Sequence, residues 1–213
     1  MSKMNLPNRL TVVRMCLVPV ILLIGFLTPK SADTLSFYIS SALCAAVFIV
    51  ASITDMLDGR IARREGLVTD FGKFMDPVAD KFMVIGALFV ILYKFPHLQL
   101  LTIITLIIVV FRELAVTSLR LVVSSGKNIV VAANMLGKIK TVTQIVAIST
   151  VFLEPVVQYL LRLVVGAVTG EAVVWRTDII PLSWISVVLS LVMTVWSGIN
   201  YIAAYWKYID TDK

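Results

Sequence analysis

The chain has 213 residues, of which 59% are hydrophobic and only 15% are charged. Soluble domains carry about 25% charged and about 45–50% apolar residues, so this composition excludes a soluble globular protein, a disordered chain and a secreted disulfide scaffold. Because a membrane-spanning helix needs about 20 residues, the length allows roughly six spans. We therefore expect one membrane domain over residues 1–213, with no room for a separate soluble domain.

Apolar segments follow one another along the chain and predict six spans. They cover about residues 8–28, 34–62, 73–94, 97–124, 134–165 and 178–206. We interpret the first as a retained span, since no small-residue cleavage site follows it before Thr28. Pro29, Pro96 and Pro181 mark breaks, and Pro155 is expected to end or kink the fifth segment. The expected fold class is an all-α integral membrane protein with six transmembrane helices.

Basic residues are distributed unevenly between the two sides of these segments. The net charge is +6, and basic residues in an integral membrane protein are first of all a topology signal, so we expect no nucleic-acid partner. With six spans, 15 of the 19 Lys and Arg residues fall on the side that holds both termini, together with 9 of the 13 acids. The positive-inside rule then predicts that both termini are cytoplasmic.

Four aspartates lie where the second and third segments reach this cytoplasmic side. Asp55 and Asp58 are three residues apart, and Asp76 and Asp80 are four apart, so each pair shares one helix face. The connector between the segments is long enough for a reversal, which would place the four carboxylates opposite one another. Ionisable groups at that depth usually face a bundle interior or a watery cavity. We therefore expect a polar cavity that faces the cytoplasm.

Carboxylates gathered in a membrane bundle need cations to stay ionised. Hard divalent metals with oxygen ligands suit them, and magnesium in particular binds a few carboxylates together with substrate phosphates. Two such ions form the clamp that is used in phosphoryl transfer. Gly59 would let a ligand approach the backbone, and Arg63, about two turns after Asp55, could reach a phosphate. Two alternatives stay open, a self-satisfied Asp/Arg salt-bridge network and a cation pathway in a transporter.

The pattern D-x-x-D-G-x-x-A-R-x8-G-x-x-x-D-x-x-x-D runs from Asp55 to Asp80. It resembles the signature of the CDP-alcohol phosphotransferases and matches it at every fixed position. The resemblance implies an integral membrane enzyme, usually a homodimer, in which an alcohol displaces CMP from a CDP-linked lipid. It further implies two metal ions, Mg²⁺ with Mn²⁺ as an alternative, and Asp80 as the general base on the alcohol. The implied metal ligands are Asp55, Asp58, Asp76 and, in part, Asp80.

Contacts to the CDP-linked lipid are expected from the signature itself and from one face of the first segment. The residues of the first segment could touch the diphosphate, although Asn8 could instead cap the helix. The expected residues are Asn8, Thr11, Arg14, Asp58, Gly59, Ala62, Arg63 and Gly72.

Over most of its length the chain resembles the bacterial members of this family whose alcohol is glycerol 3-phosphate. The shared pieces are N-L-P-N-R-L-T-V-V-R, G-K-F-M-D-P-V-A-D-K, R-E, L-R and G-K-I-K-T-V-T-Q. The resemblance implies CDP-diacylglycerol and glycerol 3-phosphate as substrates, and a cytoplasm-facing active site in the bacterial cell membrane. A dianionic acceptor needs fixed cations near the metals, whereas the alternative role of such cations is binding of anionic lipid headgroups. The expected acceptor-phosphate residues are Lys73, Lys81, Arg112, Arg120, Lys138, Lys140 and Thr141.

Rival functions stay open beside this one. The acceptor could be inositol phosphate, serine or an uncharged alcohol, with the same reaction. A membrane prenyltransferase also uses Asp-rich metal sites on diphosphates, but it normally has a longer chain and lacks the intervening G-x-x-A-R. A divalent-cation transporter would use the aspartates as ion ligands, and it would release no CMP.

Overall fold

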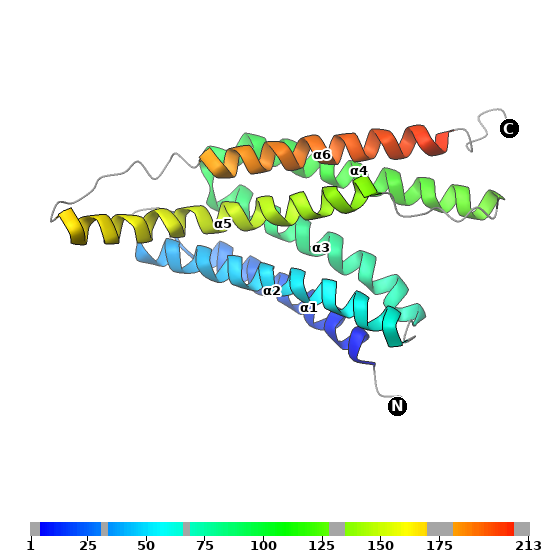
Figure 1. Cartoon of the computed structure of the whole chain (residues 1–213), viewed down its shortest axis with the longest axis horizontal. Coiled ribbons are helices and arrows are strands. Elements are labelled where there is room, and N and C mark those ends of the chain that lie inside the picture. The colour runs from blue at the N-terminus through cyan, green and yellow to red at the C-terminus, as the bar shows by residue number, and fades with distance from the viewer. Residues whose placement is uncertain (1–4, 31–33, 66–68, 128–134, 170–180, 207–213) are drawn as a thin grey trace.

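Long helices that run back and forth along one axis make up the computed structural model, which describes residues 5–30, 34–65, 69–127, 135–169 and 181–206 (Figure 1). This arrangement confirms the predicted all-α class. The start of α1 and the end of α6 lie at the same end of the bundle, on the right in Figure 1. The elements are α1 (Leu6–Leu27), α2 (Leu35–Glu65), α3 (Asp70–Lys94), a 3₁₀ turn η1 (Pro96–Leu98), α4 (Gln99–Lys127), α5 (Met135–Thr169) and α6 (Pro181–Tyr205).

Local sequence signals explain several of the helix boundaries. Thr69 is the N-cap of α3, and its Oγ1 accepts a hydrogen bond from the Gly72 backbone N–H at 3.1 Å, which satisfies one of the donors left over at a helix start. Pro96 follows the end of α3 and opens η1, and Pro181 opens α6, where a proline loses no helical hydrogen bond. The predicted breaks at Pro96 and Pro181 are confirmed.

Pro155 does not end the fifth helix, because α5 continues through it for a total of 35 residues. The expectation of a helix end there is wrong. A proline removes one backbone hydrogen bond, and in a membrane bundle neighbouring helices can accommodate that loss. Pro155 is itself buried in the bundle, so packing holds the helix together across it. At about 1.5 Å per residue, α5 is about 52 Å long and extends past its neighbours in Figure 1.

α1 and α3 approach closely because glycines face branched side chains across their interface. A methyl group added at Gly86 of α3 would lie 2.6 Å from a methyl carbon of Val18 in α1. The reverse arrangement occurs further along, where Gly25 of α1 faces Val90 of α3 even more tightly. Small residues that let two backbones approach are a standard device of membrane helix packing. This contact fixes α1 against α3, and therefore fixes the first turns of both helices at the right-hand end.

The main hydrophobic core lies among α1, α2, α3 and α5, and its members include Val18, Phe48, Ala87, Ile148 and Phe152, all nearly inaccessible to solvent. α5 is central, since it packs against α2, α3 and α6, while α4 packs against α3 and α6. The inner face of α6 is instead a stripe of small polar and apolar residues that includes Ser183, Val187, Ser190, Thr194, Ser197 and Tyr201.

Five of the helices are long and apolar enough to cross a membrane: α1, α2, η1 with α4, α5 and α6. Many large apolar side chains on their outer faces are exposed, among them Leu27, Phe111, Leu163 and Ile185, as expected for surfaces that face lipid. The chain is therefore a multi-pass membrane protein. α3 is as long as α6 but carries Asp76, Asp80 and Lys81 inside its length, so its crossing of the membrane stays a prediction.

Candidate active site

A buried arginine of α1 joins two of the predicted aspartates at the right-hand end of the bundle. Arg14 is fully buried, and its Nη1 atom lies 2.5 Å from Asp55 Oδ1 of α2 and 3.0 Å from Asp80 Oδ1 of α3. Those two carboxylates are 35% and 48% exposed. One aspartate of each signature pair, from two different helices, therefore meets the same guanidinium, and Asp80 is the more accessible of the two acids.

The rest of the same α1 face engages the start of α3. Thr11 Oγ1 donates a hydrogen bond to Asp76 Oδ1 at 2.7 Å, and Thr69 Oγ1 donates to Asn8 Oδ1 at 2.9 Å. A side chain at Gly72 would press on that contact, because an added methyl carbon would lie 3.1 Å from Asn8 Oδ1. The structure thus brings the predicted α1 residues Thr11 and Arg14 to the aspartates, and Asn8 to Thr69 and Gly72 at the start of α3.

The donor chemistry at this end suits a hard divalent cation. Asp55, Asp76 and Asp80 supply carboxylate oxygens, the ligands that magnesium prefers, and Asp55 and Asp80 already share a cationic partner in Arg14. Among the residues that the structure describes, no three acidic, histidine or cysteine side chains come close enough together to form a metal site. The side chains of Asp58, Ala62, Arg63 and Lys73 lie outside the described residues, while Gly59 lies in the last turns of α2.

A second polar feature at the same end is a cavity of about 400 Å³ between α4, α5 and α6. Two of its cations are held by neighbours on α6, since Arg112 Nη2 donates to Ser197 Oγ at 2.9 Å and Arg120 Nε donates to Tyr201 Oη at 3.5 Å. Lys138 and Arg120 are exposed, so their charges are available to a soluble anion. The lining residues are Arg112, Val116, Arg120, Gly137, Lys138, Thr141, Val142 and Tyr201.

Glu113 pairs with two of the predicted acceptor cations. Its Oε1 accepts from Arg112 Nη1 at 3.0 Å and is also in direct contact with the buried Lys140 ammonium. Lys140 is therefore turned toward this acid and does not line the cavity. A carboxylate between two cations offsets part of their charge and holds them in place, which makes Glu113 and Lys140 supports of the cavity wall.

Of the predicted acceptor residues, the structure brings Arg112, Arg120, Lys138 and Thr141 together around one cavity. Lys81 lies outside it, where its ammonium donates to Thr117 Oγ1 of α4 at 2.7 Å. This bond ties α4 to the residue next to Asp80, so it links the aspartate end of α3 to the helix that carries Arg112.

Several residues of the site were not identified from the sequence. Thr69 could have been, because a threonine just before the helical run that contains Gly72 is an N-cap signal. Ser197, Tyr201 and Thr117 gave no such signal, since each matters only through a partner on another helix.

Most of the chain matches known proteins. Residues 4–196 match the family model described as CDP-alcohol phosphatidyltransferase. The chain belongs to the CDP-alcohol phosphatidyltransferase family. The match spans α1 to most of α6 and so includes all the predicted site residues. It also agrees with the resemblance that the aspartate signature carries.

Similar members of this family come from several bacteria. A Bacillus subtilis protein named CDP-diacylglycerol–glycerol-3-phosphate 3-phosphatidyltransferase is 38% identical over 98% of this chain and 99% of the relative. Proteins of the same name from Rickettsia felis and Yersinia enterocolitica are each 33% identical, over 96% of this chain and 97% of the relative. The similarity is thus nearly end to end.

Proposed function

We propose that this CDP-alcohol phosphatidyltransferase is a phosphatidylglycerophosphate synthase, which transfers the phosphatidyl group of CDP-diacylglycerol to glycerol 3-phosphate and releases CMP. The observation that carries the proposal is the pairing of two features at one end of the bundle. Asp55, Asp76 and Asp80 converge there on α1, and a cation-lined cavity lies at the same end of α4 and α5. The names of the similar bacterial proteins support the same reaction.

The aspartates are the residues that would hold two divalent ions, Mg²⁺ with Mn²⁺ as the alternative. Asp55 and Asp58 come from α2, and Asp76 and Asp80 from α3. Bound divalent ions supply charge neutralisation of a diphosphate and of its leaving group. In the same region Asn8, Thr11, Arg14, Gly59, Ala62, Arg63 and Gly72 form the proposed site for the CDP-linked lipid. Arg14 and Thr11 orient carboxylates for this purpose through their contacts with Asp55, Asp76 and Asp80.

Asp80 is proposed as the general base. Its carboxylate is about half exposed and is held by Arg14, so it can receive a proton from a bound alcohol while its position stays fixed. The freed oxygen of the primary hydroxyl forms a bond to the phosphorus that bears diacylglycerol. The bond from that phosphorus to the bridging oxygen breaks, and CMP leaves with the bridging oxygen. The product is phosphatidylglycerophosphate, formed without a covalent enzyme intermediate.

The acceptor phosphate is proposed to bind in the cavity of α4, α5 and α6. Arg112, Arg120 and Lys138 supply three positive charges there, and Thr141 adds a hydroxyl. A dianionic phosphate gains most from charge-assisted hydrogen bonds to such groups, whereas serine offers only one carboxylate and an uncharged alcohol would leave them unused. Lys73 and Lys81 remain proposed contributors from α3. The cavity therefore favours a phosphorylated acceptor.

We further infer the orientation of the protein in the membrane and its oligomeric state. The aspartate end of the bundle, which also carries the start of α1 and the end of α6, faces the cytoplasm of the bacterial cell by the positive-inside rule. The functional unit is a homodimer, as the family resemblance implies.

The test is CMP release by the purified protein in detergent with CDP-diacylglycerol and Mg²⁺, across glycerol 3-phosphate, inositol phosphate, serine and glycerol. We expect release with glycerol 3-phosphate, and at most a few per cent of that rate with the others. Asp80→Asn, with a matched amide in place of the carboxylate, is expected to bind the CDP-lipid and to release no CMP. Faster release with another acceptor would reassign the alcohol. Cation flux in vesicles with no CMP release under any condition would instead identify a transporter.

A further inference from the structure

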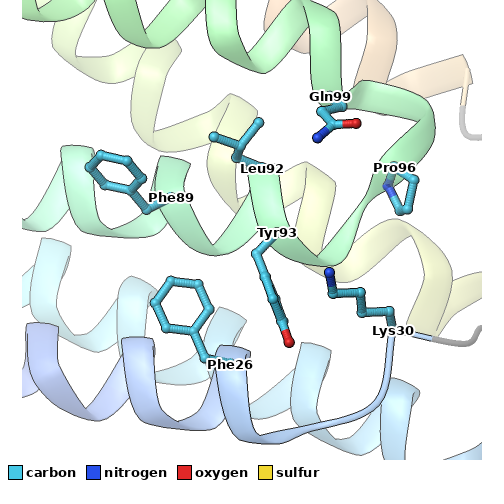
Figure 2. Close-up of a pocket in the computed structure, with 7 residues that line it drawn as sticks. All are labelled: Phe26, Lys30, Phe89, Leu92, Tyr93, Pro96 and Gln99. Carbon is cyan, nitrogen blue, oxygen red and sulfur yellow. The ribbon is translucent and has the colours of Figure 1, made fainter.

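A cavity of about 390 Å³ opens at the end of the bundle opposite the aspartates (Figure 2). It lies where α1 ends, where α3 gives way to η1 and where α4 begins, on the left in Figure 1. Tyr93 is 13 residues after Asp80 along α3, or roughly 20 Å, so this cavity is separate from the candidate active site. Its lining residues are Phe26, Lys30, Phe89, Leu92, Tyr93, Pro96 and Gln99.

The lining changes from apolar to polar toward the end of the bundle. Phe26 and Phe89 form the deeper part, and the Phe26 and Tyr93 rings meet edge to face with centroids 4.9 Å apart. Beyond them, the chain after α1 returns Lys30 over Tyr93, with its Nζ 3.7 Å from the ring centroid. Gln99 adds an amide at the start of α4. Figure 2 shows the ammonium of Lys30 beside Tyr93, on the side toward Pro96.

A second lysine lies at this end of the described chain. Behind the cavity, Lys94 is fully buried and donates hydrogen bonds to the hydroxyls of Thr28 and Ser40. Among the described residues, the one acid at this end is Glu154, which is committed to the start of α6. Its carboxylate accepts from the Ser183 backbone N–H at 2.6 Å and from the Ser183 hydroxyl at 2.5 Å. Glu154 is thus paired with the start of α6, and Lys30 and Lys94 place positive charge beside the cavity.

We propose that this cavity binds an anionic phospholipid of the membrane leaflet opposite the aspartates, with the lipid phosphate at Lys30 and acyl chains along Phe26, Phe89 and Leu92. The polarity gradient matches a phospholipid, whose charged phosphate stands at the interface and whose chains lie below it. Phe26 and Phe89 are 40% and 44% exposed, so a lipid can enter from the bilayer. The charge complementarity of Lys30 selects an anionic over a zwitterionic headgroup.

The test uses phosphatidylglycerol and phosphatidylcholine that carry the same photoactivatable acyl chain, with the full-length protein in vesicles. Labelled peptides are mapped by mass spectrometry. We expect phosphatidylglycerol to label the residues around Phe26 and the stretch 89–99 about fivefold more than phosphatidylcholine, as one lysine near a membrane surface predicts. The excess is expected to disappear in Lys30→Gln and to persist in Lys30→Arg.

Arg162→Gln is the matched control, because it removes one positive charge from α5 at the same end of the bundle and outside the cavity. It is expected to leave the labelling ratio unchanged. Equal labelling of this region by the two lipids, or an excess that survives Lys30→Gln, would overturn the proposal. An excess that disappears equally in Arg162→Gln would also overturn it. So would an excess that millimolar inorganic phosphate abolishes, because that result would point to a soluble anion as the ligand. None of these readouts depends on CMP release, so the proposal can fail while the proposed reaction stands.

Discussion

Arg14 is the residue on which the aspartate cluster is organised. A fully buried guanidinium is costly unless it is paired, and here one of its nitrogens contacts carboxylates of both α2 and α3. The arginine therefore holds Asp55 and Asp80 near each other at the cost of neutralising part of their charge. Divalent cations would bind the same two carboxylates from their exposed side.

Replacing Arg14 with glutamine is expected to make the stability of the protein depend strongly on divalent cations. Without the guanidinium, Asp55 and Asp80 lose a shared partner and repel each other, which costs about 1–3 kcal/mol, between the values for exposed and buried pairs. In EDTA the thermal midpoint of Arg14→Gln should fall below that of the wild type, and Mg²⁺ should recover most of the difference. Thermal unfolding in detergent measures it. An equal Mg²⁺ response in both proteins would refute this account of Arg14.

Lys138 and Arg120 differ from Lys140 in being exposed around the acceptor cavity. A charge-assisted hydrogen bond to phosphate contributes roughly 1.5–3 kcal/mol, so Lys138→Ala should raise the KM for glycerol 3-phosphate about tenfold or more and leave the KM for CDP-diacylglycerol nearly unchanged. Steady-state CMP release gives both constants. Lys30→Ala, at the opposite end, is the control with neither effect. Equal increases in both KM values would argue against a dedicated acceptor cavity.

The sequence predicts which residues form this site better than it predicts which of them contact one another. The spacing of Asp55, Asp58, Asp76 and Asp80 places each pair on a helix face, and the structure brings three of them to one end of the bundle. The insertion of Arg14 between two helices could not be predicted, because spacing within α1 carries no information on the register of α1 against α3. The same holds for the contact of Glu113 with Lys140, because it joins α4 to α5.

At the scale of the helices, the α1–α3 interface positions the site. Gly86 and Gly25 set how closely these helices approach, and Arg14 and Thr11 lie about one and two turns before the Val18 contact on α1. Any separation of α1 from α3 at Gly86 would therefore be transmitted to the contacts of Thr11 with Asp76 and of Arg14 with Asp80.

Gly86→Ala should lower both stability and the rate of CMP release. The added methyl would lie 2.6 Å from Val18, and overpacking of this kind costs about 1–3 kcal/mol. The double variant Val18→Ala/Gly86→Ala makes room for the new methyl and should recover a large part of both properties. Thermal unfolding and CMP release are measured on the two variants together with Val18→Ala alone. A double variant no better than Gly86→Ala would mean that this contact does not set the helix spacing.

Helix positions followed from the sequence because apolar runs and prolines mark them. The predicted segment 97–124 corresponds to η1 and α4, and the predicted break before Pro96 occurs. The behaviour of Pro155 could not be read from the sequence, since it depends on the neighbours that pack against α5. The charged start of α3 was placed correctly in a helix, which begins at Asp70 under the Thr69 cap.

At the scale of the whole molecule, the bundle has two chemically different ends. The aspartates, the acceptor cavity, the start of α1 and the end of α6 share one end, and Lys30, Lys94 and Glu154 share the other. The apolar outer surface between them suits a lipid bilayer. The topology depends on whether α3 crosses the membrane together with the other five helices. α3 begins at Asp70 and is followed by η1 and Gln99, so a crossing would place these two residues on opposite sides.

Single cysteines at Asp70 and Gln99, in a Cys16→Ser/Cys44→Ser background, test this topology. If α3 spans the membrane, the two positions lie on opposite sides, and a membrane-impermeant maleimide added to intact cells should label Gln99→Cys but not Asp70→Cys. Permeabilised cells should allow labelling of both, which controls for accessibility. Labelling of both positions in intact cells, or of Asp70→Cys alone, would contradict the six-span arrangement or its orientation.

The central claim is that the aspartates gather divalent cations against a CDP-linked diphosphate, and counting bound ions tests it most directly. Electron paramagnetic resonance of Mn²⁺ titrated into the purified protein with CDP-diacylglycerol should detect two tightly bound ions per chain. Asp55→Ala and Asp76→Ala should each lose at least one of them, while Glu154→Ala at the opposite end should keep both. Weak, unsaturable Mn²⁺ binding that is the same in all four proteins would contradict the claim.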